Sequence, residues 1–415
     1  MVKFKMGGFL HLSALALAVT AGHAADAPTG QGSVTNGYLS QTDFDSAVVL
    51  FNQVQTATTG LGPVFNDKSC GSCHHAPTSG GAGAARGHRA GIFDGNTFSD
   101  PPGGSLIDTR ALVPRIIPVV PQNANVQTFR STPSTLGDGY VEAVPDSTLI
   151  AIANAQPAKS GNKIHGIVIN VPVLEAINTT AVGRFGWKNQ HASLVSFSAD
   201  AFRNEEGITT PLFKTELTSN GNPIDAYEPA GFFSNVPNRP DNSDVMTFAN
   251  LIRSTPARAR PPGAPSFNTP ANARLNAKDT QIVSGQTTFN AIGCGICHVQ
   301  SLTTAPAGTR LFGGTYTVPA ALGGLTFYPF SDYLLHDIGT GDGIVQNGGQ
   351  ATRNTVRTAP LWGIGFRKAF LHDDSLTTVS DAILHHGGEA AYVTQNYQNL
   401  SPTDQQNLLV FLQSL

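Results

Sequence analysis

Two pentapeptides of one type contain all four cysteines of the chain. In a Cys-x-x-Cys-His sequence the two thiols can add to the vinyl groups of haem, and the adjoining histidine can bind the haem iron. The spacing therefore predicts two covalently attached c-type haems, with the histidine of each pentapeptide as the proximal ligand. The two copies read Cys70-Gly-Ser-Cys73-His74 and Cys294-Gly-Ile-Cys297-His298.

Paired cysteines also occur in thioredoxin-like redox sites and in zinc sites. A thioredoxin-like site needs one Cys-x-x-Cys in a βαβ setting, and a zinc site usually draws four ligands from two paired motifs. The histidine directly after both pairs, His74 and His298, favours haem over each. Zinc is the main alternative. Haem attachment would use every thiol and would leave neither a disulfide nor a free cysteine.

Short segments around the two pentapeptides recur in the same order. Phe65-Asn66 and Phe289-Asn290 precede the two cysteine pairs at the same distance. Arg130-Ser-Thr-Pro133 and Arg357-Thr-Ala-Pro360 follow them. This repeat predicts two similar halves, each with one haem, that arose by internal duplication.

Apolar periodicity predicts helices next to the pentapeptides. Ser40 is placed as the cap of a helix whose one face carries Phe44, Val48 and Phe51. The residues before the second pentapeptide show the same pattern less cleanly. Ser401-Pro402 begins a C-terminal helix with a core-facing apolar stripe.

The remaining sequence predicts the fold class and its divisions. A β-branched run over residues 164–171 predicts strands, and 44 Gly and 27 Pro predict much irregular backbone. We expect a mainly α, loop-rich protein of two cytochrome c-like domains, each enclosing one covalent haem, with a small β insertion in the first half. A Pro-rich stretch that begins at Thr255 is expected to connect the two domains. The first domain would span residues 25–254, the linker 255–275 and the second domain 276–415.

The N-terminal residues predict export. Lys3 and Lys5, the apolar run over 7–20 and the small residues that follow form a secretory signal peptide over residues 1–24. Covalent haem attachment outside the cytoplasmic membrane makes the periplasm the expected location. We expect no membrane span, because no later stretch reaches the roughly 20 apolar residues that one needs. A net charge of -3 with 13% charged residues also argues against a nucleic-acid partner.

An ordered set of further segments resembles the superfamily of di-haem cytochrome c peroxidases and methylamine-utilisation di-haem enzymes. Within it, the chain most resembles the branch of di-haem oxidoreductases described as putative peroxidases. These segments cover most of the chain after the signal peptide. They are Gly60-Leu-Gly-Pro-Val-Phe-Asn66, Gly183-Arg-Phe-Gly-Trp-Lys188, Glu206-Gly-Ile-Thr209, Leu335-His-Asp-Ile-Gly339, Arg357-Thr-Ala-Pro-Leu-Trp-Gly363, Leu371-His372-Asp373 and His386-Gly-Gly-Glu-Ala390.

The resemblance implies a division of labour between the halves. Peroxide is cleaved at the first haem, and the second haem passes it electrons from a small cytochrome or copper protein. Trp187 matches the tryptophan between the haems, with core packing as the alternative. Glu205 falls near the distal glutamate, with an ordinary surface pair with Glu206 as the alternative. Calcium between the halves is known in the family, but the sequence shows no ligand cluster that demands it.

The sixth iron ligands follow less directly. Only Met246 could supply a thioether after signal cleavage, and its helical setting favours core packing. Histidine is therefore the expected ligand at both irons. His336 is the first choice for the second haem, with His386 and His372 behind it. His88, in a Gly-rich loop, is the first choice for a displaceable ligand on the first haem.

Three functions are consistent with these sequence features. The leading hypothesis is a periplasmic di-haem oxidoreductase that delivers electrons from a donor protein to peroxide. The second is peroxide-driven oxidation of a residue on a partner protein, which the lack of the family's distal glutamine favours, since Ser196 and Phe197 occupy its neighbourhood. The third is an electron-transfer cytochrome with no small substrate.

Overall fold

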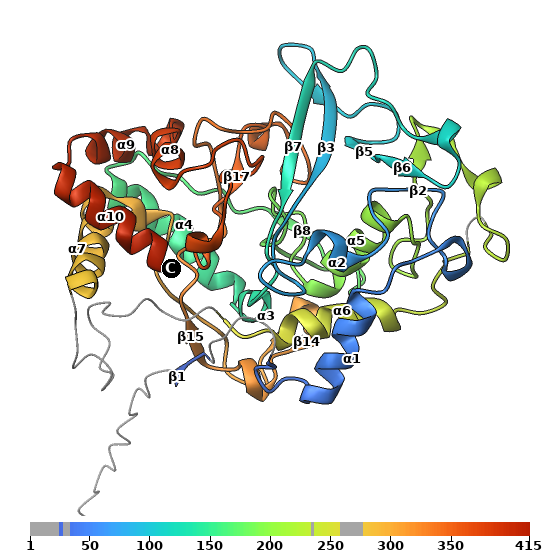
Figure 1. Ribbon diagram of the computed structural model, residues 1–415, viewed down its shortest axis with the longest axis horizontal. Helices are drawn as coiled ribbons and strands as arrows, with labels where there is room; N and C mark the ends of the chain where they lie inside the picture. The colour runs from blue at the N-terminus through green and yellow to red at the C-terminus, as the bar shows by residue number, and fades with distance from the viewer. Residues whose placement is uncertain (1–24, 28–33, 234–235, 258–276) are drawn as a thin grey trace, which may run out of the picture.

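The structure, a computed structural model, describes residues 25–27, 34–233, 236–257 and 277–415. The predicted signal peptide and all but the first three residues of the predicted linker lie outside the described residues. Helices form the larger part of the regular structure, and short strands lie between them along the chain (Figure 1). The division into domains stays a prediction.

The described part of the first half contains six helices, one of which, α2, is formed by the first pentapeptide. Helix α1 begins after Ser40, whose side chain accepts a hydrogen bond from the amide of Asp43, as the capping signal predicts. Phe44 and Phe51 are buried, and Phe51 packs edge-on against Phe248 of α6. The helices are α1 (Gln41–Phe51), α2 (Cys70–Cys73), α3 (Asp138–Glu142), α4 (Asp146–Ser160), α5 (Leu194–Glu206) and α6 (Ser243–Ser254).

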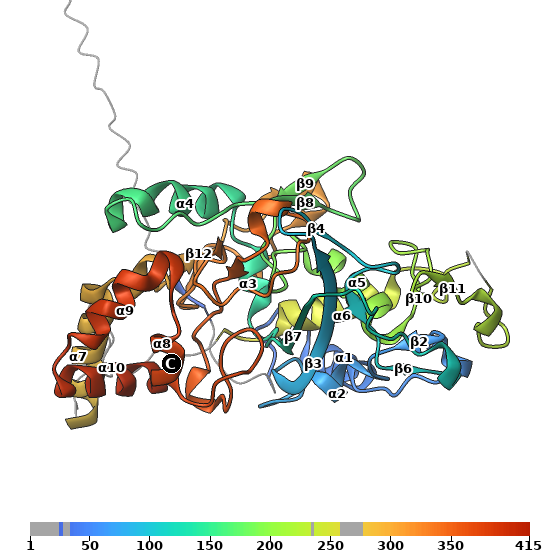
Figure 2. The same cartoon turned by 90° about the horizontal axis from the view of Figure 1, so that it is seen from above.

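Helix α4 extends from the first half toward the second. It lies on the side of the molecule that carries the C-terminal helices (Figures 1 and 2). The side-chain amide of Gln156 donates a hydrogen bond to the carbonyl of Ile296, inside the second pentapeptide, at 3.1 Å. A first-half helix therefore helps to position the second candidate site.

The longest strand pair was not predicted. Strand β3 (Gly83–Phe93) pairs antiparallel with β7 (Val126–Thr132), and β4 (Phe98–Ser99) and β5 (Leu106–Ile107) also pair with β3. The prediction of a Gly-rich loop here is wrong, because His88 lies within β3 opposite Phe129. Glycine suits this strand: a Cβ on Gly91 would lie 2.0 Å from the Phe98 ring.

The second half is built on helices that pack against one another. Helix α7 (Ala277–Ile292) packs against α10 (Pro402–Ser414), with α8 (Val379–Leu384) and α9 (Ala391–Gln398) beside them. Ser401 caps α10 and Pro402 occupies its first turn, as predicted. The buried aromatic residues Phe289, Phe330 and Phe411 contact one another at this core.

Short strands occur in both halves, so the expected confinement of β structure to one insertion was too narrow. The predicted insertion does contain a hairpin, β8 (Asn170–Pro172) with β9 (Thr180–Val182). Strand β16 (Leu335–His336) pairs with β17 (Val356–Arg357) near the second pentapeptide. The others are β1 (Ala25–Asp26), β2 (Val64–Phe65), β6 (Arg110–Ala111), β10 (Thr218–Ser219), β11 (Asn222–Pro223), β12 (Leu302–Thr303), β13 (Arg310–Leu311), β14 (Tyr316–Thr317) and β15 (Leu325–Phe327).

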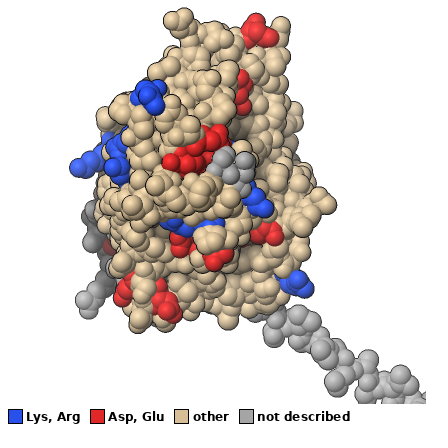
Figure 3. Space-filling model, turned by 90° about the vertical axis from the view of Figure 1, so that its right-hand side faces the viewer, with Lys and Arg blue, Asp and Glu red and all other residues tan. Residues whose placement is uncertain are grey.

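The surface agrees with the low charge content of the sequence. On the face at the right-hand end of Figure 1, acidic and basic side chains are scattered among uncharged ones (Figure 3). Among the described residues, none of the helices combines the length and the apolar character needed to cross a bilayer.

Candidate haem-binding sites

The first pentapeptide forms the short helix α2 and the residue after it. Ser69 caps α2 by accepting a hydrogen bond from the amide of Ser72, and His74 ends it. His74 Nδ1 lies 3.1 Å from the Gly81 carbonyl oxygen, so the ring donates this hydrogen bond. Burial lowers the pKa of His74, which keeps the imidazole neutral. A neutral imidazole is the form that binds a metal.

The second pentapeptide holds its histidine in the same manner. Cys294–Ile296 form a 3-10 turn, and His298 Nδ1 donates to the carbonyl of Phe330 at 2.9 Å. Burial lowers the pKa of His298 to about 4. A backbone carbonyl that fixes Nδ1–H leaves Nε2 as the ligand nitrogen, the usual arrangement behind a metal-bound histidine.

The four thiols are poor candidates for a dithiol redox site. Burial raises the pKa of Cys70, Cys294 and Cys297, and it raises the pKa of Cys73 to about 11. Thiols with such values are protonated at neutral pH, whereas dithiol exchange needs the thiolate. Their electrostatic environment therefore disfavours a dithiol redox site.

A mostly apolar cavity opens beside the second pentapeptide. His298 and His386 both line it. His386 Nδ1 donates to the carbonyl of Ala382 at 2.6 Å, so its Nε2 is left for a metal. The charge of His386 also contributes to the lowered pKa of His298, as expected for neighbouring rings. Other lining residues include Phe289, Cys294, Cys297, Ile338, Leu361, Leu371, Ile383 and Leu412.

Another cavity, of about 780 Å³, lies beside the first pentapeptide. We call it the first cavity, and the cavity beside the second pentapeptide the second cavity. This volume is within the range of roughly 300–1,000 Å³ typical of ligand and cofactor pockets. Its walls come from the residues just after the pentapeptide, from the Pro133 segment and from the second half. They include His75, Ala82, Gly83, Arg86, Pro133, Leu136, Trp362, Phe366 and Lys368.

The two cavities share part of their walls. Trp187, Arg357 and Arg367 line both of them. Trp187 is 6% exposed, and its indole Nε1 donates to the carbonyl of Ser131 at 2.8 Å. Its ring lies edge-on to His372 at 6.2 Å between centroids. The structure therefore places the predicted bridging residue at the junction of both cavities.

The residues of these cavities fit haem. Cys294, Cys297 and the neutral His298 line the cavity beside the second pentapeptide, which is mostly apolar. The cavity beside the first pentapeptide begins at His75, directly after the neutral His74. Arg357 is buried, and its Nε has no hydrogen-bond partner among the described residues. A buried guanidinium of this kind suits the propionate groups of haem, since arginine binds carboxylates well.

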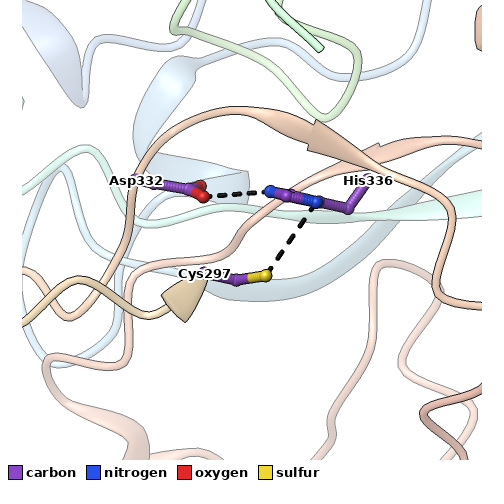
Figure 4. Close-up of side chains that lie close together, drawn as sticks. All are labelled: Cys297, Asp332 and His336. Atoms are coloured by element: carbon purple, nitrogen blue, oxygen red, sulfur yellow. Dashed lines mark hydrogen bonds and ion pairs between the residues drawn. The ribbon is translucent and has the colours of Figure 1, made fainter. Parts of the chain in front are cut away.

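His336 occupies a different environment from the one expected. Its Nε2 lies 2.9 Å from Asp332 Oδ2 and its Nδ1 lies 3.0 Å from Glu389 Oε2, so both ring nitrogens are engaged (Figure 4 shows the Asp332 contact). Burial alone would lower the pKa of His336, but the Asp332 carboxylate outweighs it and raises that pKa well above its ordinary value. An imidazolium between two carboxylates has no free lone pair for iron.

The same residues bear on the zinc alternative. Cys297, Asp332 and His336 bring three ligand-type atoms within 4.8 Å of one another (Figure 4). Zinc would need a thiolate and a neutral imidazole. In the structure, His336 Nε2 is instead hydrogen-bonded to Asp332 and its Nδ1 to Glu389. We interpret the cluster as a buried ion network.

Glu205 lies at the edge of the first pentapeptide. Its backbone carbonyl accepts hydrogen bonds from the amides of Asn66 and Asp67, and its carboxylate contributes to the raised pKa of Cys73. The side chain is open to solvent, yet the protein atoms around it raise its pKa. Neighbouring Glu206 is buried and accepts a hydrogen bond from the Cys70 thiol at 3.3 Å.

Met246 and His88 both lie away from the two cavities. Met246 is 39% exposed on α6, so the predicted core packing of this residue is wrong. His88 stacks on Phe129 at 4.5 Å, and its buried Nε2 has no partner among the described residues. Neither residue lines the two cavities described above. The role of His88 as a displaceable ligand stays a prediction.

Sequence reasoning ranked His386 below His336 and gave Arg357 no role. The signal for His386 was its place just after the short helix α8, at a position that lines the second cavity. The signal for Arg357 was its place in the repeated Arg-x-x-Pro segment. The sequence alone does not show which histidine has a free ring nitrogen, nor that the Arg357 guanidinium is buried beside both cavities.

Comparisons with known proteins agree with the resemblance. The family described as di-haem oxidoreductase, putative peroxidase, matches residues 121–415, more than half of the chain. No curated protein matches. Among solved structures, a MauG-like protein associated with microbial copper homeostasis is similar at 13% identity and a TM-score of 0.43, covering 95% of this chain and 93% of that one. A hydrazine synthase of Kuenenia stuttgartiensis is similar at 14% identity and a TM-score of 0.38, covering 99% of this chain and 100% of that one.

Proposed function

Since this chain belongs to the di-haem oxidoreductase, putative peroxidase family, we propose that it is a periplasmic c-type enzyme that reduces peroxide with electrons from a small donor protein. In this proposal each half is a cytochrome c-like domain that encloses one covalent haem. The donor is a small cytochrome or copper protein. The overall reaction consumes one hydrogen peroxide, two electrons and two protons and yields two waters.

One observation carries the proposal: the two cavities beside the two pentapeptides meet at Trp187. An aromatic side chain held between two redox centres gives electrons a short route from one to the other. Its indole is fixed by the hydrogen bond to Ser131, and its backbone carbonyl accepts a hydrogen bond from the Arg357 amide at 2.8 Å. Both ends of the residue are thus anchored.

The chain provides a holder for each haem. Cys70 and Cys73 would anchor the first and Cys294 and Cys297 the second, with the proximal histidines of the pentapeptides as iron ligands. When bound, the haem irons supply the one-electron redox chemistry and the peroxide-binding position that side chains lack. The apolar walls of the second cavity exclude water from that centre.

His386 would hold the iron of the second haem together with His298. Its Nε2 has no hydrogen-bond partner among the described residues and it shares the cavity with His298, whereas both nitrogens of His336 are occupied by carboxylates. Two histidine ligands would give a low potential, because a methionine ligand is one of the factors that raise it. The second centre would then serve electron transfer and leave peroxide to the first.

Carboxyl groups at the first pentapeptide can supply protons. Nearby protein atoms raise the pKa of Glu205, and burial raises the pKa of Asp108 to about 8, with Glu205 adding to the effect. Asn66 donates a hydrogen bond to Asp108 Oδ1 at 3.2 Å and also interacts with Glu205. Asp108 can therefore hold a proton at neutral pH, as a general acid for cleavage of the O–O bond must.

The test is peroxide turnover by the exported, haem-loaded protein with a reduced donor cytochrome. We expect rapid oxidation of the donor when peroxide is added. We also expect slower turnover in Trp187→Phe with unchanged haem content. A fully loaded protein that does not consume peroxide, with low-spin iron at both sites and no ligand binding, would instead support an electron-transfer cytochrome.

A second function is oxidation of a residue on a docked partner protein. Phe366 is 62% exposed at the rim of the first-site cavity, and Arg367 and Lys368 follow it. An exposed aromatic residue with adjacent cations is typical of a protein contact. This function predicts a peroxide-oxidised state that persists until a cognate protein is added, whereas the leading proposal predicts that a small donor removes it.

A further inference from the structure

Lys188 directly follows Trp187 and is buried, with 2% of its surface exposed. Its ammonium donates hydrogen bonds to three backbone carbonyls in one short segment. The distances are 2.8 Å to Thr352, 3.0 Å to Arg353 and 2.6 Å to Thr355. A lysine that uses all its donors on backbone carbonyls is unusual, because a buried ammonium needs strong compensation.

A carboxylate completes the surroundings of this ammonium. Asp342 Oδ1 lies 3.2 Å from Lys188 Nζ, and the Asp342 side chain is fully buried. Its other oxygen pairs with Arg130 of β7 at 2.7 Å. The segment 352–355 and Asp342 belong to the second half, whereas Lys188 and Arg130 belong to the first. The cluster therefore joins the two halves.

Three carbonyls and a carboxylate form an oxygen shell that would suit a hard cation. Calcium is bound by backbone carbonyls and carboxylates in flexible arrangements of this kind. In this protein the cation inside the oxygen shell is the ammonium group of Lys188. Burial lowers the pKa of Lys188 to about 8, and Asp342 opposes this effect, so most of the ammonium is charged at neutral pH.

The cluster adjoins the junction of the two cavities. Segment 352–355 leads directly into β17, where the Arg357 amide donates to the Trp187 carbonyl. On the other side, Arg130 precedes Ser131, whose carbonyl accepts the indole hydrogen bond of Trp187. Lys188 and its partners thus hold both backbone segments that anchor Trp187.

We propose that Lys188 is a built-in cation: its ammonium fills an oxygen cage formed by residues 352–355 and Asp342, and so fixes Trp187 between the cavities in place of a bound metal ion. Lys188 is a positioning residue in this account, because it acts through Trp187. The proposal depends on the fold alone and not on the reaction proposed above.

The test replaces the cation and asks whether a metal ion takes its place. Lys188→Met keeps an unbranched side chain of similar length without the charge. In the haem-loaded protein, we expect it to lower the unfolding temperature by about 5 °C, because a buried carboxylate loses its partner. We expect Ca²⁺ to restore that temperature and to bind with one more equivalent per chain than in the wild type, measured by equilibrium dialysis.

Two controls locate the effect. Lys159→Met, at an exposed position of α4, should change neither unfolding nor Ca²⁺ binding. Lys188→Met combined with Asp342→Asn should lose the added Ca²⁺ site. The proposal is wrong if Lys188→Met unfolds like the wild type, if Ca²⁺ neither restores it nor binds to it, or if chelation destabilises the wild type as much as the substitution does. A Lys188→Met protein that accumulates folded only when Ca²⁺ is supplied during export would support it.

Discussion

At the scale of single residues, the second candidate site depends on which ring nitrogens are free. His298 and His386 each give Nδ1–H to a backbone carbonyl, at 2.9 and 2.6 Å. His336 gives both nitrogens to carboxylates. The difference lies in hydrogen bonding and not in the sequence pattern, since all three histidines lie near the second cavity.

This difference predicts opposite results for two substitutions. His386→Ala should open the sixth position of the second iron, so the absorption and paramagnetic resonance spectra should gain a high-spin component. His336→Gln should leave the spin state unchanged, because the residue is not a ligand. It should destabilise the fold by roughly 3–5 kcal/mol, as expected when one partner of a buried ion network is removed. Loss of the low-spin signal in His336→Gln alone would contradict the assignment.

At the scale of elements, the core beneath the second pentapeptide supports its histidine. Phe411 of α10 is fully buried against Phe289 and Phe330, and the carbonyl of Phe330 holds His298. Phe411→Ala should cost about 3–5 kcal/mol of unfolding free energy through the cavity it leaves. The exposed Gln406→Ala on the same helix is the control. Denaturant unfolding measures both, and equal effects would argue against this packing.

A carboxyl pair outside the two cavities predicts a pH dependence. Burial, with the charge of Glu228 next in size, raises the pKa of Glu216 to about 8, from 4.5 for an unperturbed glutamate. The folded state therefore binds more protons than the unfolded state between these values. This contribution to stability is full below about pH 4.5 and is lost as the pH rises through about 8. Unfolding at several pH values should show a flatter profile in Glu216→Gln, and an unchanged profile would contradict the pairing.

The sequence predicts helices with strong local signals and misses pairings that depend on distant residues. Ser40 and Ser401 cap helices where expected, because a cap needs only neighbouring residues. Strand β3 was missed because its glycines favour a loop locally, while its hydrogen bonds come from residues some 40 positions away in β7. The same limit holds for Lys188, whose partners lie in residues 342–355.

At the scale of the whole molecule, the two halves are joined around one tryptophan. The cavities of both candidate sites share Trp187 and Arg357, and α4 of the first half contacts the second pentapeptide. Each half therefore contributes to the other's site. We expect that a chain cut between the halves would lose function even if both fragments bound haem.

The most direct test of the account is the intact mass of the exported, haem-loaded protein. If both pentapeptides carry haem, the measured mass should equal that of the polypeptide plus two haems. We also expect one haem in Cys70→Ala/Cys73→Ala, and one in Cys294→Ala/Cys297→Ala. A polypeptide that carries no haem, or that carries zinc at its cysteines in place of haem, would contradict the account.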